Sequence, residues 1–266
     1  MRNKKADPGT KPPAVKSISR AGSVLRCLGS GYGTITEIAN RCNLSKSTVH
    51  RLLKALEETL LVSRNPINHR YYLGPLIAQF SSNPENTHDY LITSALDEMK
   101  HLSEKYGETM TLGLLSGIQY IHLHEVQSPS NLKVIESGPP VRPLFMGATT
   151  RVLMAQLPPA ELRIVLNNTT FREVTPNTLT DKKDLKSRLE IVKSQGYETS
   201  YGETVPGALC IAAPINSYVL PAVISVVGPE NRLEPRREDA TRELLVSAER
   251  ITRDITEIFG PKEAPA

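Results

Sequence analysis

The sequence predicts an α+β protein with a small helical head and a larger body in which helices pack on an antiparallel sheet. Two observations come from periodicity. Apolar residues recur at helical spacing between residues 18 and 56 and then alternate as in strands up to residue 74, whereas strand-like and helical segments succeed each other from residue 88 onward. The third is charge. Residues 1–80 hold 13 Lys/Arg and 4 Asp/Glu, a net +9, and residues 81–266 hold 19 and 24, a net −5, inside a total of +4. A basic head suggests a polyanion as its partner.

Three helices are expected in the head. Apolar residues at helical spacing form the first, which ends at Gly29. Thr36 is expected as N-cap of a second helix that carries Ile38, Ala39 and Cys42 on one face. Ser45 is expected to cap a third helix, whose apolar stripe is Val49, Leu52, Leu53 and Leu56.

Two short strands joined by a turn follow, at residues 60–64 and 69–74. Three helices and a hairpin in about sixty residues outline a winged helix-turn-helix, although a plain three-helix bundle with a hairpin cap has the same outline. The polar residues of the third helix favour the first interpretation. A helix fits the major groove of DNA, and these polar side chains lie on the faces that the apolar stripe of the third helix does not use. The expected DNA contacts are Arg20, Thr36, Ser45, Lys46, Ser47, Thr48, His50, Arg51 and Lys54 in the helices, with Arg64, His69 and Arg70 on the wing.

The body is expected to alternate strands and helices. Strands are predicted at residues 109–115, 119–126, 132–136, 208–215 and 222–227, and helices at 89–105, 148–157, 184–194 and 236–258, with a further helix start at 159–162. The predicted organisation is a disordered basic tail (1–17), the winged helix-turn-helix (18–74), a linker (75–88) and the body (89–260).

Several classes of function are disfavoured. The N-terminus carries no signal peptide pattern and no apolar run is long enough to span a membrane, so a cytoplasmic protein without membrane contact is expected. Cys27, Cys42 and Cys210 are too few and too far apart for a disulfide framework, and no catalytic motif or cofactor site is recognised. His122 and His124 share a strand face but have no third ligand, which leaves a metal-responsive regulator as a minor alternative.

With these segments placed, the chain resembles the IclR family of bacterial transcriptional regulators over about residues 17–260. The motifs that carry the resemblance are ISRA at 18–21, LSKSTVHRLL at 44–53, YLG at 72–74, GY at 196–197, ETVPGALCIAAP at 203–214 and ISVVGP at 224–229. The resemblance implies a winged helix-turn-helix, a linker helix and a GAF-like effector-binding and oligomerisation domain. It also implies a homodimer or a dimer of dimers on pseudo-palindromic operator DNA, with affinity for DNA controlled by a small organic or aromatic acid.

Residues of the effector site are carried over from the resemblance onto Leu132, Ala148, Thr149, Ser200, Cys210, Ser225 and Val227. A helix that starts near Ala148 would offer its N-terminus to a carboxylate. The chain departs from the family near Ser200, which lacks a common acidic residue, and at Val227, Phe145 and Thr150-Arg151. These departures indicate a less polar pocket that takes a larger or more apolar acid, or a pocket that has lost its ligand. Repression is the expected mode of action, and the alternative from another class is a sensor or scaffold whose head does not bind specific DNA.

Overall fold

The computed structural model describes residues 15–80, 84–135, 139–144, 147–170 and 172–259. Residues 1–14 of the expected basic tail lie outside these ranges, and Lys16 already belongs to the first helix. The chain divides into two compact units between Asn83 and Pro84. The stretch expected as a linker, 75–88, contains one short helix and the start of a long one.

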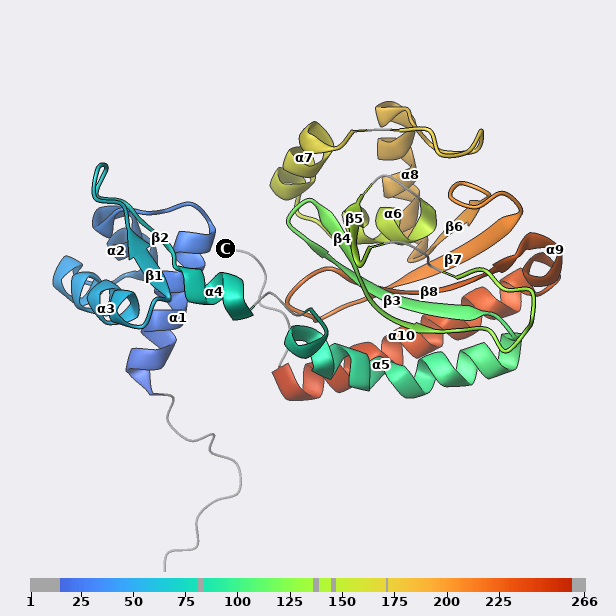
Figure 1. Cartoon of the computed structure of the whole chain (residues 1–266), viewed down its shortest axis with the longest axis horizontal. Coiled ribbons are helices and arrows are strands. Elements are labelled where there is room, and N and C mark those ends of the chain that lie inside the picture. The colour runs from blue at the N-terminus through green and yellow to red at the C-terminus, as the bar shows by residue number, and fades with distance from the viewer. Residues whose placement is uncertain (1–14, 81–83, 136–138, 145–146, 171, 260–266) are drawn as a thin grey trace, which may run out of the picture. The chain divides into compact units, whose positions relative to one another are not determined.

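The N-terminal unit consists of three helices, a two-stranded sheet and a short fourth helix (Figure 1). These elements are α1 (Lys16–Gly29), α2 (Ile35–Cys42), α3 (Lys46–Glu58), β1 (Val62–Arg64), β2 (Tyr71–Leu73) and α4 (Pro75–Phe80). Apolar side chains from α1, α2, α3 and both strands form a single core, in which Val24, Ile38, Val49 and Leu53 are completely buried. The apolar spacing read from the sequence therefore selects the side chains that make this core.

The start of α2 differs from the expectation. Thr34 is the N-cap, and Thr36 lies exposed in the first helical turn. The Glu37 amide donates to Thr34 Oγ1 (3.2 Å), and Glu37 Oε2 accepts from the Thr34 amide (2.8 Å). This is a capping box, which requires a Glu three residues after the cap, and only Thr34 has that spacing. The prediction of Thr36 as the cap was wrong although the sequence contained the signal.

We expect Thr34→Ala to destabilise the N-terminal unit by about 1 kcal/mol, because the Glu37 amide at the start of α2 loses its acceptor and Glu37 Oε2 loses the Thr34 hydroxyl as a donor. Thr36→Ala is the matched control, since it makes the same change two residues away in an exposed position and should stay within about 0.5 kcal/mol of the unaltered protein. Hydrogen exchange followed by mass spectrometry of α2 peptides measures both. Equal effects of the two substitutions would contradict the assignment of the cap.

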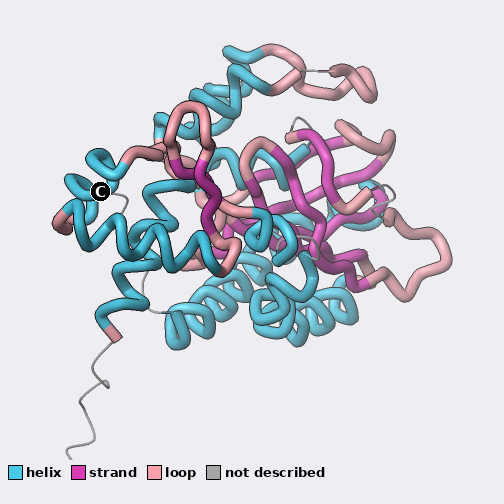
Figure 2. The backbone as a smooth tube through the Cα atoms, turned by 60° about the vertical axis from the view of Figure 1, so that its left-hand side comes forward, coloured by secondary structure: helices cyan, strands magenta, loops and turns pink. Residues whose placement is uncertain are grey.

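The C-terminal unit is a six-stranded sheet with helices on both faces (Figure 1). Its elements are α5 (Pro84–Tyr106), β3 (Thr109–Ser116), β4 (Gln119–Val126), β5 (Val141–Pro143), α6 (Gly147–Ala155), α7 (Pro159–Asn168), α8 (Lys182–Gln195), β6 (Glu198–Tyr201), β7 (Ala208–Ile215), β8 (Ala222–Pro229), α9 (Glu230–Leu233), the 3-10 helix η1 (Glu234–Arg236) and α10 (Arg237–Phe259). The long helices α5 and α10 lie side by side on one face (Figure 2), and α6, α7 and α8 belong to the other.

The strand order is β5-β4-β3-β8-β7-β6, and every neighbouring pair is antiparallel. The central strand β3 is buried at nearly every position because both faces of the sheet are covered. The side chains of successive residues of β8 point to opposite faces of the sheet. Ile224 and Val226 belong to the core beneath α5 and α10, whereas Ser225 and Val227 point to the opposite face.

The edges of the sheet differ from the expectation. Residues 132–135 form no strand, and the strand that pairs with the outer side of β4 is β5, with Tyr120 opposite Arg142. The predicted strand at 132–136 was wrong over 132–135, and residue 136 lies outside the described residues; alternation of apolar residues cannot tell which of two nearby segments reaches a given edge. The strand β6 was not predicted, since its first residue, Glu198, is a fully buried carboxylate that sequence patterns assign to the surface.

Candidate functional site

The helix α3 presents a polar face that is separate from its buried stripe. Ser45 caps it by accepting from the Thr48 amide (3.2 Å). Val49, Leu53 and Leu56 are buried, whereas the exposed residues of this helix include Lys46, Ser47, His50, Arg51 and Lys54. The helix can therefore offer hydroxyl, imidazole and cationic groups without disturbing the core.

The turn between α2 and α3 fixes the position of this helix. Asn43 takes the left-handed conformation (φ 50°) that ends α2, and the Leu44 amide donates to the Ala39 carbonyl (3.0 Å).

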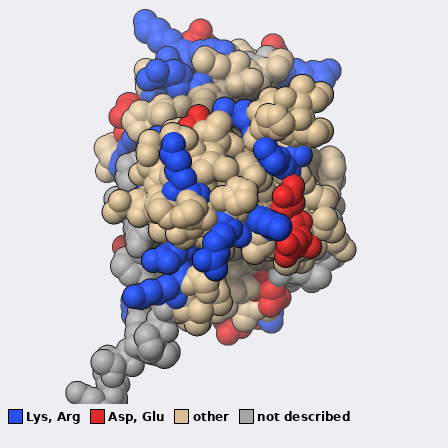
Figure 3. Space-filling model, turned by 90° about the vertical axis from the view of Figure 1, so that its left-hand side faces the viewer, with Lys and Arg blue, Asp and Glu red and all other residues tan. Residues whose placement is uncertain are grey.

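Figure 3 shows several Lys and Arg side chains on the face in view, with a compact acidic group at one side. The acidic residues of the first 80 include Glu37, which is half-buried in its capping box, and the pair Glu57 and Glu58 at the end of α3.

The loop between β1 and β2 is a tight wing. Asn65 Oδ1 accepts from the amides of Ile67 (2.8 Å) and Asn68 (3.2 Å). The side chain of Ile67 at the tip is 89% exposed. The predicted contacts Arg64 and His69 are exposed on the same hairpin. Ile67 was not among the predicted contacts. Its position in the turn between the two strands is the only feature of the sequence that could have pointed to it.

Arg70 lies differently from the other predicted DNA contacts. Its Nη2 donates to the Gly31 carbonyl (3.2 Å) and to Glu37 Oε2 (3.3 Å), and the residue is half-buried. The bonds from Thr34 and then the Arg70 charge hold the pKa of Glu37 below its ordinary value. Arg70 therefore ties the wing to α2 instead of reaching outward. Of the remaining predicted contacts, Thr48 is half-buried and the others, including Arg20 and Thr36, are exposed.

A cavity of about 240 Å³ lies in the C-terminal unit between the start of α6 and the face of the sheet opposite α10. Its walls come from β4, β5, α6, β6, β7, β8 and three loops. The lining residues are Tyr120, Val134, Ile135, Arg142, Gly147, Ala148, Thr149, Thr150, Val174, Ser200, Thr204, Val205, Cys210, Ser225 and Val227. Among the residues that the structure describes, this lining contains one arginine and no carboxylate.

The polar groups of the cavity cluster at the start of α6. The Ala148 amide donates to Ser200 Oγ (3.1 Å), and Thr149 Oγ1 lies 3.7 Å from Cys210 Sγ. Thr111 and Ser225 share a hydrogen bond between their hydroxyls (2.7 Å). The first amides of α6 have no acceptor within the helix, and the helix dipole makes this end positive. An anionic group is the ligand chemistry that suits this end of the cavity.

Much of the remaining lining is apolar. It consists of Val134, Ile135, Val174, Val205 and Val227, together with the ring of Tyr120. That ring lies across Gly113, where a β-carbon would come within 2.3 Å of Tyr120 Cε2. The missing side chain at Gly113 therefore gives the tyrosine its place beside the cavity.

The structure brings together six of the seven predicted effector residues, namely Ala148, Thr149, Ser200, Cys210, Ser225 and Val227. Leu132 does not join them, since its side chain is 71% exposed and its carbonyl accepts from Arg232 Nη2 (3.1 Å). Sequence reasoning missed Tyr120 and Arg142. Strand alternation could have placed Tyr120 on a face of the sheet, but only the pairing of β4 with β5 brings Arg142 beside it.

A buried ion-pair network adjoins this cavity. Arg151 of α6 donates from Nη1 and Nη2 to the two oxygens of Glu203 (2.7 and 2.8 Å) and from Nε to Glu198 Oε2 (3.1 Å). Its side chain is 4% exposed. Burial would lower the pKa of Arg151, but the bonds and charges of both carboxylates raise it overall. Since Glu203 precedes the lining residues Thr204 and Val205, Arg151 anchors one wall of the cavity.

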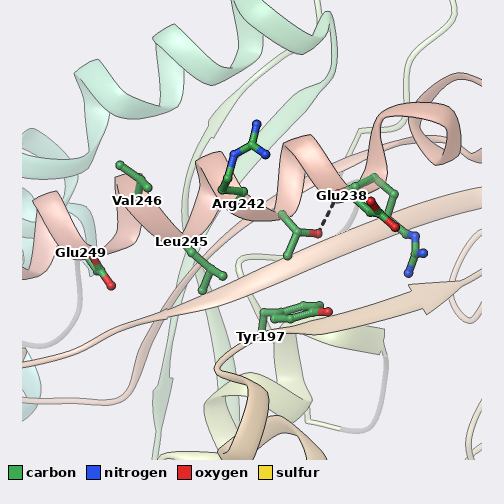
Figure 4. Close-up of a pocket in the computed structure, with 8 residues that line it drawn as sticks. Tyr197, Glu238, Arg242, Leu245, Val246 and Glu249 are labelled. Carbon is green, nitrogen blue, oxygen red and sulfur yellow. Dashed lines mark hydrogen bonds between the residues drawn. The ribbon is translucent and has the colours of Figure 1, made fainter.

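A larger hollow of about 510 Å³ lies on the outer surface of α10 (Figure 4). Tyr197 faces Leu245 across it, and Arg242, Glu238 and Glu249 stand along the helix. Its charged groups have both signs, so it selects neither an anion nor a cation. None of the predicted site residues lines it.

Two further possibilities find no support. Within the described ranges, no group of three or more His, Cys, Asp and Glu could hold a metal ion, so His122 and His124 lack a third ligand there. No helix among the described residues is long and apolar enough to cross a membrane.

Comparisons with known proteins agree on both units. Residues 87–253 match the family described as the bacterial transcriptional regulator IclR C-terminal domain, and residues 17–66 match the IclR helix-turn-helix domain. The transcriptional regulator KdgR of Escherichia coli K12 is 29% identical over 263 residues, which is 98% of this chain and 98% of KdgR. XynR of the same organism is 30% identical over 207 residues, covering 76% of this chain and 81% of XynR.

Solved structures give the same architecture. An IclR transcriptional regulator from Alicyclobacillus acidocaldarius has a TM-score of 0.58 and 27% identity, covering 91% of this chain and 99% of its own. An IclR homologue from Microbacterium hydrocarbonoxydans, solved in complex with 4-hydroxybenzoate, has a TM-score of 0.56 and 24% identity, with the same coverage.

Proposed function

The chain belongs to the IclR family of bacterial transcriptional regulators, and we propose that it is a repressor whose affinity for its operator is set by a small acid in the cavity beside α6. It is a DNA-binding transcription regulator and not an enzyme. The observation that carries the proposal is a pair of separate sites, a polar recognition face on α3 and a cavity whose described lining contains an arginine and no carboxylate. We place its action in the cytoplasm, on chromosomal DNA.

The proposed DNA contacts follow from the exposure of α3. Lys46, Ser47, Thr48 and Arg51 enter the major groove, where hydroxyl and guanidinium groups can reach base edges. Arg20 and Lys54 hold phosphates, and Arg64 and His69 on the wing contact the backbone or the minor groove. His50, Ser45 and Thr36 complete this surface. Arg70 is assigned to holding the wing because its Nη2 is bound to Glu37 and Gly31.

A second copy of the chain is part of the proposal. Two heads related by a two-fold axis would read the two halves of a pseudo-palindromic operator, as a dimer or as a dimer of dimers.

We expect Arg51→Ala to lower operator affinity by about 1–3 kcal/mol while leaving binding to unrelated DNA nearly unchanged, because Arg51 is proposed to read a base. Lys54→Ala should weaken both kinds of DNA alike and reduce the salt dependence, because a phosphate contact carries no sequence information. Gel-shift titrations of both variants at several salt concentrations measure this. Unchanged operator affinity in both variants would refute the role of α3.

The proposed effector is an aromatic or acyl carboxylic acid. Its carboxylate would lie at the start of α6 near Arg142, and its apolar part against Val134, Ile135, Val205 and Val227. The apolar wall favours such a ligand over an acid with only two or three carbons, because burying each methylene group contributes about 0.8 kcal/mol.

Calorimetric titration against a panel tests this assignment. The panel contains glyoxylate, pyruvate, benzoate, 4-hydroxybenzoate and short acyl acids, and operator affinity is measured with each. We expect binding of the larger acids and a change in operator affinity with the ones that bind. Tight binding of glyoxylate or pyruvate alone would overturn the assignment.

A further inference from the structure

Two cysteines meet in the N-terminal unit although 15 positions separate them in the sequence. Cys27 lies near the end of α1 and Cys42 is the last residue of α2. Their sulfur atoms are 3.4 Å apart, which is hydrogen-bond distance for thiols and longer than a disulfide bond of about 2.05 Å. Both are free thiols of intermediate exposure.

The pair borders a surface hollow of about 330 Å³ that also contains Arg26, Tyr32 and Arg41. Arg26 and Arg41 are exposed, and the Arg41 guanidinium lies over the ring of Tyr32 at 3.7 Å from its centroid. The sulfurs are therefore reachable by a molecule of the size of hydrogen peroxide, and two cations stand beside them. A thiolate next to positive charge is the form in which cysteine reacts.

We propose that Cys27 and Cys42 form a peroxide-sensitive dithiol that closes to a disulfide and thereby lowers the affinity of α3, the recognition helix, for DNA. The second part rests on the proposed contact of α3 with the operator. The third cysteine of the sequence, Cys210, belongs to the C-terminal unit, where its sulfur lies 3.7 Å from Thr149 Oγ1, and it serves as the internal control.

The chemistry balances with hydrogen peroxide as the oxidant. The sulfur of Cys27 attacks one peroxide oxygen, the O–O bond breaks, and the products are a sulfenic acid on Cys27 and one water. The sulfur of Cys42 then attacks the Cys27 sulfur, the S–O bond breaks, and the oxygen leaves as a second water with the thiol proton. Two electrons pass from the sulfurs to the peroxide. Burial and the neighbouring Cys27 thiol raise the pKa of Cys42 to about 11, so Cys42 is mostly protonated at neutral pH and the second step should become faster as the pH rises.

Closing the bond is expected to shift the two helices against each other. The sulfurs have to approach from 3.4 Å to about 2.05 Å, and Val24 of α1 and Ile38 of α2 are completely buried in the core that the two helices share. Cys42 is separated from Ser45, the cap of α3, by only Asn43 and Leu44. A displacement at Cys42 is therefore passed to the start of the recognition helix.

The test oxidises the full-length protein with hydrogen peroxide, followed by tryptic mapping and operator gel shifts on the same sample. Trypsin cleaves after Arg26, Arg41 and Lys46, so the two cysteines fall on separate peptides that only a disulfide can join. We expect this linked pair, a reactive thiol left only on Cys210, and an operator affinity reduced by about tenfold that dithiothreitol restores.

Three variants make the result specific. Cys27→Ser and Cys42→Ser should bind the operator normally without peroxide and keep that affinity with it, whereas Cys210→Ser should respond like the unaltered protein. Unlinked peptides after oxidation would overturn the dithiol, and an unchanged affinity of the linked protein would overturn its effect on DNA. If Cys27→Ser and Cys42→Ser also lost operator affinity with peroxide, the response would have to come from other residues. Operator binding by the reduced protein tests the proposed function separately.

Discussion

Replacing Arg151 by Leu is expected to destabilise the C-terminal unit by about 3–5 kcal/mol, because it leaves the carboxylate of Glu203 without its cation and that of Glu198 with Arg188 only. Glu198 is completely buried and the side chain of Glu203 is 13% exposed. Each accepts from the guanidinium of Arg151, so the substitution removes a charged hydrogen-bond donor from both buried groups. Urea unfolding of the full chain, followed by hydrogen exchange of peptides from α6 and β6, measures the loss.

The same substitution should also weaken effector binding. Glu203 is held at its side chain by Arg151 and at its carbonyl by Thr178 Oγ1 (2.8 Å), and the two lining residues Thr204 and Val205 follow it. Losing the first anchor loosens this wall of the cavity.

Arg188→Leu is the matched control for Arg151→Leu. Arg188 also binds Glu198 (2.7 Å), but its side chain is 39% exposed and Arg151 still neutralises the carboxylate in its absence. We expect a loss of about 1 kcal/mol or less. An equal loss of unfolding free energy in the two variants would contradict the proposed role of Arg151 as the central cation of the network.

Val227→Phe is expected to reduce effector affinity by about 5- to 150-fold, which corresponds to the 1–3 kcal/mol that overpacking costs. Val227 pairs with Cys210 across β7 and β8, and both side chains line the cavity. A phenyl ring at this position occupies volume that the ligand needs. Calorimetry with the tightest acid of the panel measures the change.

Val219→Phe makes the same substitution outside the cavity, at a residue that is 73% exposed in the connection between β7 and β8. It should bind the effector normally, and both variants should keep the operator affinity of the ligand-free protein. Normal effector binding by Val227→Phe would show that the ligand lies elsewhere.

Much of the secondary structure could be predicted from short-range patterns. The helices α1 to α3, the cap at Ser45 and the strands β3, β4, β7 and β8 all follow from the spacing of apolar residues and from turn residues nearby. The resemblance to a family pointed to six residues that line one cavity, because the motifs that carry it include strands on which several of them lie.

The pairing of buried polar groups could not be predicted in this way. Glu198 lies in β6 at the edge of the sheet because Arg151 of α6 and Arg188 of α8 meet it there, 47 and 10 positions away in the sequence. Arg142 enters the cavity wall only through the register of β5 with β4. Arg70 turns toward α2 because Glu37, 33 positions earlier, accepts its hydrogen bond.

The sequence alone therefore determined which residues form helices and the main strands, the basic character of the head and the polar face of α3, since periodicity, capping and net charge are local properties. The tertiary structure alone decided which charges are buried, which segment completes the edge of the sheet and that Cys27 and Cys42 touch. These depend on contacts between distant parts of the chain, where a buried charge is stable only beside a partner that the fold brings to it.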